Sequence, residues 1–331
     1  MSILKGRADL QRSPAISIVT TSDLNSRIVS WLEEVRKELE APSVGDKGAG
    51  KEHPLLGYSL EGAQLGRILG VGSFAVVFEL HDPADSGRKL AVKVLRRSTI
   101  GRKSEQENES FRREVDIGMR LEHPSITRIH RFSERAQTRF VVLDKVDGET
   151  LRAVKGPLSL DRYREIFSPL AAGLDYAHQM GVVHRDLKPE NIMLGQGGLK
   201  ILNFGLARTV GARDLTLTRK FKGPPKYCAP EQAQNTKLVG PATDQFAFGL
   251  LSFQYLTGAY PYPEFPKDPL QNVFVRLTQP AARLSTAWPE VGNEAEEAMQ
   301  RMLSTKPEER FPSLKEAFET FSQALQKDPI S

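Results

Sequence analysis

In the first half of the chain, several short segments alternate apolar and polar positions. Residues 89–95 read KLAVKVL, with Lys93 in the centre of the alternation, and a period of two residues predicts a strand. The apolar run LGRIL precedes GVGSFAVVF, which predicts a hairpin with Gly70 and Gly72 at its turn. A later run, FVVLDKVDGETL, is also rich in β-branched and apolar residues. These segments predict that this half of the chain forms a sheet.

Helical spacing replaces the alternation in other segments. In SFRREVDIGMRLEHPSI, Glu114 falls on the same helix face as Phe111, Val115 and Met119. The stretch LKEAFETFSQALQ near the end of the chain predicts a final amphipathic helix.

Residues 1–56 precede these elements and carry an amphipathic pattern of their own. Ser22 or Asp23 can cap a helix over residues 23–40. Its apolar stripe consists of Leu24, Ile28, Trp31, Leu32, Val35 and Leu39. The run APSVGDKGAGKEHP that follows predicts a flexible linker. The stripe must be buried, either on the protein's own folded part or, as the sharper alternative, on a partner protein or a dimer mate.

The chemistry of the chain is concentrated in residues 184–205, which read HRDLKPENIMLGQGGLKILNFG. This run resembles the catalytic loop H-R-D-x-x-x-x-N and the metal-binding loop D-F-G of protein kinases, with Asn203 in place of the second aspartate. A solvated polar loop is the alternative, but it would match this many fixed positions only by rare coincidence. By the resemblance, Asp186 orients the acceptor hydroxyl and Lys188 contacts the transferred phosphate. Asn191 and Asn203 would then be the metal-site residues.

Two upstream motifs lie at the distances that a protein kinase requires. GVGSFAVVF resembles the glycine-rich loop over nucleotide phosphates. Lys93 matches the strand lysine that pairs those phosphates and is held by a helix glutamate, for which Glu114 is the candidate. Taken singly, an ordinary hairpin, a snorkelling lysine and a solvated helix charge are reasonable alternatives. It is much less reasonable that all three alternatives hold together in one chain.

Two downstream motifs resemble structural parts of the same family. Ala229-Pro230-Glu231 would end the activation segment, and Glu231 is expected to pair with Arg310. Asp244, with Phe246 and Gly249 behind it, resembles the D-x-F-x-x-G helix that steadies the catalytic loop. As families, aminoglycoside and choline kinases lack the A-P-E segment, so its presence favours a protein kinase.

The register of these motifs also implies a nucleotide site. By the resemblance, Leu143 is the gatekeeper, and the backbone of Asp144 and Val146 meets the adenine edge. Ordinary core packing is the alternative for the apolar members. The implied nucleotide-contacting residues are Gly70, Gly72, Ser73, Phe74, Val77, Ala91, Lys93, Leu143, Asp144, Val146 and Met193.

The resemblance runs from about Leu65 to about Phe321 and is closest to bacterial serine/threonine protein kinases of the Hanks type. It implies an α+β, bilobal protein kinase-like fold with an antiparallel sheet and one main helix in the N-lobe and a mostly helical C-lobe. The expected parts are an N-terminal extension (1–56), the N-lobe (57–146), the C-lobe (147–326) and a tail (327–331). It further implies ATP with Mg²⁺, or Mn²⁺ as a substitute, and a protein substrate with a serine or threonine acceptor.

Three positions depart from the kinase pattern. Asn203 lacks the negative charge that would face magnesium, a hard cation that prefers charged oxygen ligands. We therefore expect ATP to bind, while the free-energy barrier to transfer of its γ-phosphate is raised by on the order of several kcal/mol. Ala75 replaces the third loop glycine, and Pro224 stands where bacterial relatives usually carry threonine. Two histories fit: an active kinase with an engineered aspartate-to-asparagine change, or a natural pseudokinase.

The run DLTLTRKFKG between Asn203 and Glu231 suggests regulation. Thr216 and Thr218 form a T-x-T pair at a spacing typical of bacterial kinase autophosphorylation, and Arg185 could pair with the phosphate. The alternative is a basic, flexible loop whose threonines cap turns.

Composition and charge limit which partners and which cellular location we expect. The 331 residues carry a net charge of +5 without a basic stripe, so we expect no nucleic-acid partner. Cys228 is the single cysteine, which excludes an internal disulfide and fits a reducing cytoplasm. We find no apolar run of transmembrane length and no signal peptide, and we expect a cytoplasmic location.

We therefore predict an ATP-dependent serine/threonine protein kinase that transfers the γ-phosphate to protein and is impaired by Asn203. The first alternative is a pseudokinase that binds nucleotide and acts as a scaffold or regulator. A small-molecule kinase ranks last. The substrate and the upstream signal do not follow from the sequence.

Overall fold

The computed structural model describes residues 59–60, 62–71, 75–95, 112, 115–135, 138–204, 226–234, 238–264 and 269–327. The chain divides into two compact units, Met1–Leu65 and Gly66–Ser331. In the first unit, β1 (Ser59–Leu60) pairs antiparallel with the start of β2 (Ala63–Val71). Gly62 in the turn has a φ of 93°, which residues with a side chain rarely adopt. The helix and linker predicted within residues 1–56 lie outside the described residues.

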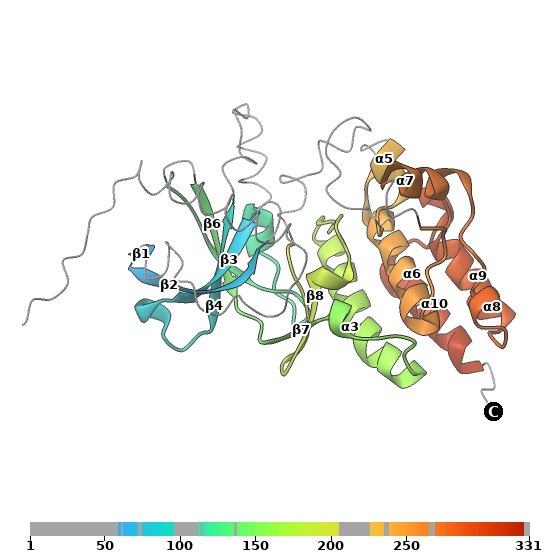
Figure 1. The fold of residues 1–331 in the computed structure, drawn as a ribbon, viewed down its shortest axis with the longest axis horizontal. Helices are drawn as coiled ribbons and strands as arrows, with labels where there is room; N and C mark the ends of the chain where they lie inside the picture. The colour runs from blue at the N-terminus through green and yellow to red at the C-terminus, as the bar shows by residue number, and fades with distance from the viewer. Residues whose placement is uncertain are drawn as a thin grey trace, which may run out of the picture. The chain divides into compact units, whose positions relative to one another are not determined.

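The second unit begins with an antiparallel sheet in the strand order β2-β3-β4-β6-β5 (Figure 1). The strands after β2 are β3 (Ala75–His81), β4 (Leu90–Leu95), β5 (Ile129–Arg135) and β6 (Thr138–Asp144). The strand predicted over residues 89–95 is confirmed as β4. Val77 lies opposite Lys93, and Lys93 lies opposite Val141. Because paired residues project to the same side of a sheet, these side chains share one face.

That face of the sheet packs against helical residues, of which 112 and 115–119 are described. Val115 is fully buried, and Met119 packs against the same apolar cluster. The other buried members of this cluster are Ala75, Leu95, Ile129 and Val141. The helix face predicted from spacing is therefore confirmed for Val115 and Met119, while Phe111 and Glu114 lie outside the described residues.

The part of the chain after β6 is mostly helical (Figure 1). Its helices are α3 (Leu160–Gln179), α5 (Pro230–Gln234), α6 (Pro241–Thr257), α7 (Pro269–Thr278), α8 (Leu284–Ala287), α9 (Asn293–Met302) and α10 (Leu314–Lys327). A small antiparallel sheet has the order β7 (Gly148–Thr150), β8 (Ile192–Gly195), β9 (Gly198–Ile201). Short 3₁₀ turns are η1 (Pro83–Asp85), η3 (Leu151–Ala153), η4 (Pro189–Asn191) and η6 (Pro307–Glu309). The final helix predicted from the sequence is confirmed as α10.

Helix α6 is the centre of the helical part. It is buried on nearly every side, as expected of a helix that is apolar all round, and α3, α9 and α10 pack against it. Gly249 lets the Leu303 side chain pack closely against α6, because a Cβ at position 249 would lie 2.9 Å from the Cδ2 atom of Leu303. The helix ends at Gly258, whose φ of 72° is the left-handed conformation of many helix C-termini. Helix α6 supports the loop of residues 184–191 through Asp244.

Candidate active site

The loop of residues 184–191 is anchored by one carboxylate of α6. Asp244 accepts hydrogen bonds from the amides of His184 and Arg185, both at 2.7 Å, and from the side chain of His178 at 2.8 Å. Burial alone would raise the pKa of Asp244, but the hydrogen bonds from His178 and His184 outweigh burial and lower it. The predicted steadying role of this helix is confirmed. The contribution of His178 was not predicted, because its pairing with Asp244 spans 66 residues.

Arg185 holds the loop in an uncommon conformation. Its φ is 65°, in the left-handed region that costs a residue with a side chain about 1–2 kcal/mol. Its amide is held by Asp244, and its carbonyl accepts a hydrogen bond from Gln232 Nε2 at 2.8 Å. The two contacts fix the backbone immediately before Asp186. Thr216 and Thr218 lie outside the described residues. The pairing of Arg185 with a phosphate on either threonine therefore stays a prediction.

His184 connects the catalytic loop to the N-F-G segment. Its Nδ1 atom accepts a hydrogen bond from the Asp186 amide at 3.3 Å, and its Nε2 atom donates to the Leu202 carbonyl at 2.8 Å. The partners therefore select the neutral tautomer with the proton on Nε2. The ring also meets Phe204 edge to face, with the centroids 4.8 Å apart. These contacts position Asn203, which lies between Leu202 and Phe204.

A continuous series of hydrogen bonds joins the four predicted polar site residues. Lys93 Nζ donates to Asn203 Oδ1 at 2.8 Å, and Asn203 Nδ2 donates to Asn191 Oδ1 at 2.8 Å. Asn191 Nδ2 then donates to the carbonyl oxygen of Asp186 at 2.6 Å and to its carboxylate at 3.0 Å. We call this series the amide relay. It brings together Lys93, Asp186, Asn191 and Asn203, although Lys93 is 110 residues from Asn203 in the sequence.

The two ends of the amide relay differ in exposure. Burial lowers the pKa of Lys93 to about 8, and the nearby Asp186 opposes the shift. At the other end, half of the Asp186 side chain is exposed. Both its oxygens accept from Lys188 Nζ, at 2.8 and 3.1 Å. The predicted pairing of Lys93 with Glu114 stays a prediction, because Glu114 lies outside the described residues.

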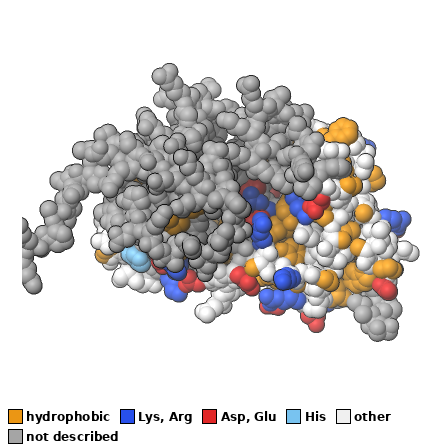
Figure 2. Space-filling view, viewed as in Figure 1, with side chains coloured by type: hydrophobic (Ala, Val, Ile, Leu, Met, Phe, Trp, Pro, Cys, Tyr) orange, Lys and Arg blue, Asp and Glu red, His pale blue; other side chains and the backbone are white. Residues whose placement is uncertain are grey.

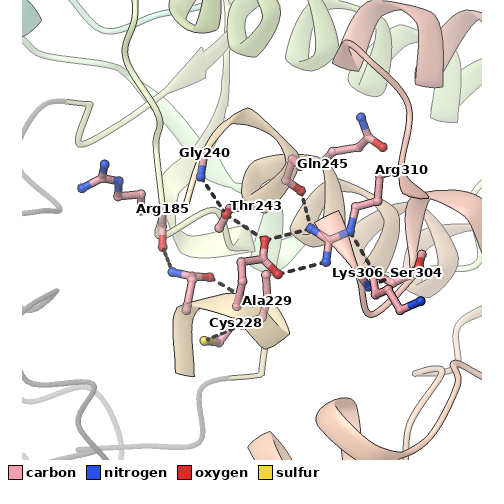
Figure 3. A network of polar contacts seen from close by, with 12 residues as sticks. Arg185, Cys228, Ala229, Gly240, Thr243, Gln245, Ser304, Lys306 and Arg310 are labelled. Carbon is pink, nitrogen blue, oxygen red and sulfur yellow. Dashed lines mark hydrogen bonds and ion pairs between the residues drawn. The ribbon is translucent and has the colours of Figure 1, made fainter. Parts of the chain in front are cut away.

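A second, buried network holds α5 against the helical part (Figure 3). Glu231 accepts two hydrogen bonds from the Arg310 guanidinium, at 2.8 and 2.9 Å, and one from Thr243 at 2.8 Å. Both charged side chains are almost completely buried. Arg310 also lies over the ring of Phe246, 4.8 Å from its centroid. The predicted Glu231–Arg310 pair is confirmed, and its role is structural.

The strand register places three predicted adenine contacts on one face of the sheet. Ala91 lies opposite Leu143, two residues from the pair of Val77 and Lys93, so all four side chains project to the same side. Met193 is a partly buried residue of β8. The Asp144 amide donates to Arg128 O at 3.0 Å, and the predicted adenine contact of the Asp144 backbone stays a prediction.

The other predicted nucleotide contacts are less well placed. Gly70 lies inside β2 and not at the turn of the predicted hairpin, because β2 continues to Val71. Val146 lies after β6 in the predicted hinge. Gly72, Ser73 and Phe74 lie outside the described residues. Their roles therefore stay predictions.

An ionic cluster beside the predicted hinge was not anticipated. Lys145 Nζ contacts Glu79 at 2.7 Å and Asp147 at 3.0 Å, and Lys89 Nζ contacts Asp147 at 2.6 Å. A surface hollow beside these residues is lined by Lys89, Asp147, Gly148, Glu149, Leu194, Gly195 and Gln196. No local pattern indicates this cluster, since its charges come from three separate segments.

The antiparallel sheet with its helix, the helical part and the anchored catalytic loop together define a protein kinase-like fold, as predicted. Comparison with known proteins agrees. The family model of the protein kinase domain matches residues 63–324. The chain therefore belongs to the protein kinase family.

Bacterial serine/threonine kinases are among its relatives. A probable serine/threonine-protein kinase of Streptomyces coelicolor is 30% identical over 277 residues, which cover 81% of this chain and 40% of the relative. The probable serine/threonine-protein kinase PknB of Lactococcus lactis is 33% identical over 203 residues, covering 59% of this chain and 31% of the relative. The chain thus spans less than half the length of these curated relatives.

A solved structure shows the same fold. The PknI kinase domain of Mycobacterium tuberculosis is 26% identical to this chain, with a TM-score of 0.64, and the match covers 81% of this chain and 98% of that structure. Within the residues that the structure describes, no helix combines the length and the apolar character needed to span a membrane.

Proposed function

We propose that this chain is an ATP-binding protein serine/threonine kinase domain whose γ-phosphate transfer is impaired by Asn203. The observation that carries the proposal is the amide relay, which joins the strand lysine Lys93 to the catalytic-loop carboxylate Asp186. In protein kinases these two positions serve opposite ends of the reaction, the nucleotide phosphates and the acceptor hydroxyl.

The proposed roles follow from the charges at each end of the relay. Among the described residues, Asn203 accepts from one of the three N–H donors of Lys93, so a phosphate oxygen can accept from another. Asp186 is exposed enough to accept a hydrogen bond from a substrate hydroxyl. Lys188 Nζ contacts the Asp186 carboxylate and would neutralise negative charge on the transferred phosphoryl group. ATP supplies the phosphoryl group when it is bound. The adenine would lie against Val77, Ala91, Leu143 and Met193.

Asn203 is the proposed cause of slow transfer. Protein kinases in general use Mg²⁺, held by an aspartate and an asparagine. Here the corresponding donors are two neutral amides, and each amide oxygen already accepts an N–H bond. Among the described residues, no cluster of three or more His, Cys, Asp or Glu side chains could hold a metal ion. The described donor set therefore does not fit a tightly held divalent cation.

Reversion tests the proposed function. Asn203→Asp should produce phosphate on Thr216 or Thr218 when the chain is incubated with Mg-ATP, because a carboxylate restores the missing charge. Phosphopeptide mass spectrometry measures this, and Asn203→Asp combined with Asp186→Asn is the matched inactive control. A reverted chain that stays unmodified and modifies no serine or threonine peptide would refute the kinase assignment.

A pseudokinase is the second candidate, and the amide relay favours it. Its hydrogen bonds are satisfied without a reacting nucleotide, which suits a domain kept for binding. This candidate predicts nucleotide or partner binding and no gain of transfer in the Asn203→Asp chain. The same experiment therefore separates the two functions.

The remaining assignments rest on the family and on composition. We propose protein substrates with serine or threonine acceptors, the lobe bounds 57–146 and 147–326, and a partner or dimer contact through residues 23–40. The single cysteine favours a cytoplasmic location. On the face drawn in Figure 2, basic and acidic side chains of the described residues lie interspersed. The expectation of no nucleic-acid partner rests on the charge pattern of the sequence.

A further inference from the structure

The amide relay can run in only one direction. The Lys93 ammonium has donors and no acceptor, so Asn203 must turn Oδ1 toward it and Nδ2 away from it. At the other end, the Asp186 carbonyl and carboxylate accept, so Asn191 must present Nδ2 to them and Oδ1 to Asn203. The two ends therefore fix the orientation of both amides.

This orientation fills the place that a cation would take. A divalent ion shared by positions 191 and 203 needs an oxygen from each, and Mg²⁺ requires them at about 2.0–2.1 Å. Instead, the N–H of Asn203 Nδ2 points at Asn191 Oδ1 from 2.8 Å. An amide hydrogen, with its partial positive charge, thus lies between the two side chains that would have to share a metal ion.

We propose that this chain binds nucleotide without a divalent cation, with Lys93 and the Asn203 amide supplying the positive charge beside the phosphates. The inference rests on the proposed nucleotide binding and adds the ionic form of the ligand, which is the free nucleoside triphosphate anion. It concerns binding and not transfer.

The Asn203→Asp variant provides the contrast. A carboxylate has no N–H, so it can accept from Lys93 but can offer only an oxygen to Asn191 Oδ1. Two facing oxygens repel unless a cation bridges them or Asn191 turns its amide away from Asp186. The variant should therefore acquire a requirement for a cation that the native chain lacks.

The test is a calorimetric titration of ATP into the full chain, once with excess EDTA and once with excess MgCl₂. For the native chain we expect the ATP affinities measured with EDTA and with MgCl₂ to differ by less than about threefold. This ratio is well below the tenfold that corresponds to about 1.4 kcal/mol. For Asn203→Asp we expect binding at least about fivefold tighter with Mg²⁺, within the usual range of coupling between two ligands. Asn293→Asp makes the same chemical change at an exposed residue of α9 and should behave as the native chain does.

Each other outcome overturns a defined part of the account. If the native chain requires Mg²⁺ as strongly as Asn203→Asp does, cation-free binding is wrong while nucleotide binding stands. If only Asn203→Asp binds ATP, the amide relay excludes nucleotide and the inference is wrong. If neither chain binds ATP under either condition, the proposed nucleotide binding fails and the inference fails with it.

Discussion

At the scale of single residues, Lys93 determines how the site handles charge. It is a largely buried ammonium whose pKa burial lowers to about 8, and its one described acceptor is the neutral Asn203 Oδ1. An ammonium in such surroundings gains most from an anionic ligand, because hydrogen bonds to charged groups are stronger than neutral ones. A nucleotide phosphate is such a ligand.

Replacing this lysine should therefore weaken nucleotide binding. We expect Lys93→Met to lower ATP affinity roughly tenfold or more, since a hydrogen bond to a charged group contributes about 1.5–3 kcal/mol. Equilibrium titration with a fluorescent ATP analogue measures the change. Lys155→Met, at an exposed lysine, is the control and should leave affinity unchanged. Equal affinities for the two variants would show that Lys93 does not contact the nucleotide.

The thiol of Cys228 gives a prediction that depends on pH. Burial raises its pKa to about 12, from an ordinary value near 9. Between these two values the native state keeps a proton that the unfolded state releases, so the free energy of unfolding should fall as pH rises above about 9. Below about 9 both states hold the proton, and this contribution is constant.

Thiol labelling measures the same property directly. At pH 8 the folded chain should react with iodoacetamide far more slowly than the chain in denaturant, because the thiolate is the reactive form. Cys228 is the only cysteine, so the mass gain reports on a single site. Labelling of the folded chain at the rate of the unfolded chain would contradict the raised pKa.

At the scale of elements, the buried pair of Glu231 and Arg310 joins α5 to the turn before α10. Both side chains are at most 1% exposed, and the guanidinium contacts both carboxylate oxygens. Such a pair is costly to break on one side, since the remaining charge stays buried without compensation. The pair thus ties the end of the activation segment to the helical part.

We expect Glu231→Ala to lower the free energy of unfolding by about 3–5 kcal/mol, as for other broken buried pairs. Adding Arg310→Met should recover part of the loss, because it removes the unpaired charge. Urea denaturation followed by circular dichroism measures both variants. The control is Glu319→Ala at an exposed pair, with an expected change of at most about 1 kcal/mol. A small effect at Glu231 would contradict its structural role.

The elements also show what the sequence could and could not predict. Strand β4, helix α10 and the roles of Asp244 and Glu231 follow from local periodicity and motif spacing. The direction of the amide relay does not, because it depends on which partners can donate after Lys93 and Asn203 have met across 110 residues. The ionic cluster at Lys145 was missed for the same reason.

At the scale of the whole molecule, the family could be predicted from the sequence, but the ability of the site to catalyse phosphoryl transfer could not. The run at residues 184–205 identified a kinase-like fold, which the matched family model and the solved structure confirm. The single departure at Asn203 left active and inactive histories open, because one neutral amide alters charge while it preserves shape. The structure adds that both the oxygen and the nitrogen of this amide are hydrogen-bonded inside the site, to Lys93 and to Asn191.

The rate of phosphoryl transfer tests the central claim most directly. We propose a single-turnover measurement of γ-phosphate transfer from Mg-ATP to the chain's own threonines, with the native chain and Asn203→Asp compared side by side. The account predicts that the reverted chain is faster by roughly 10²–10³-fold, the usual effect of one electrostatic contact made in the transition state. Equal rates in the two chains would contradict it.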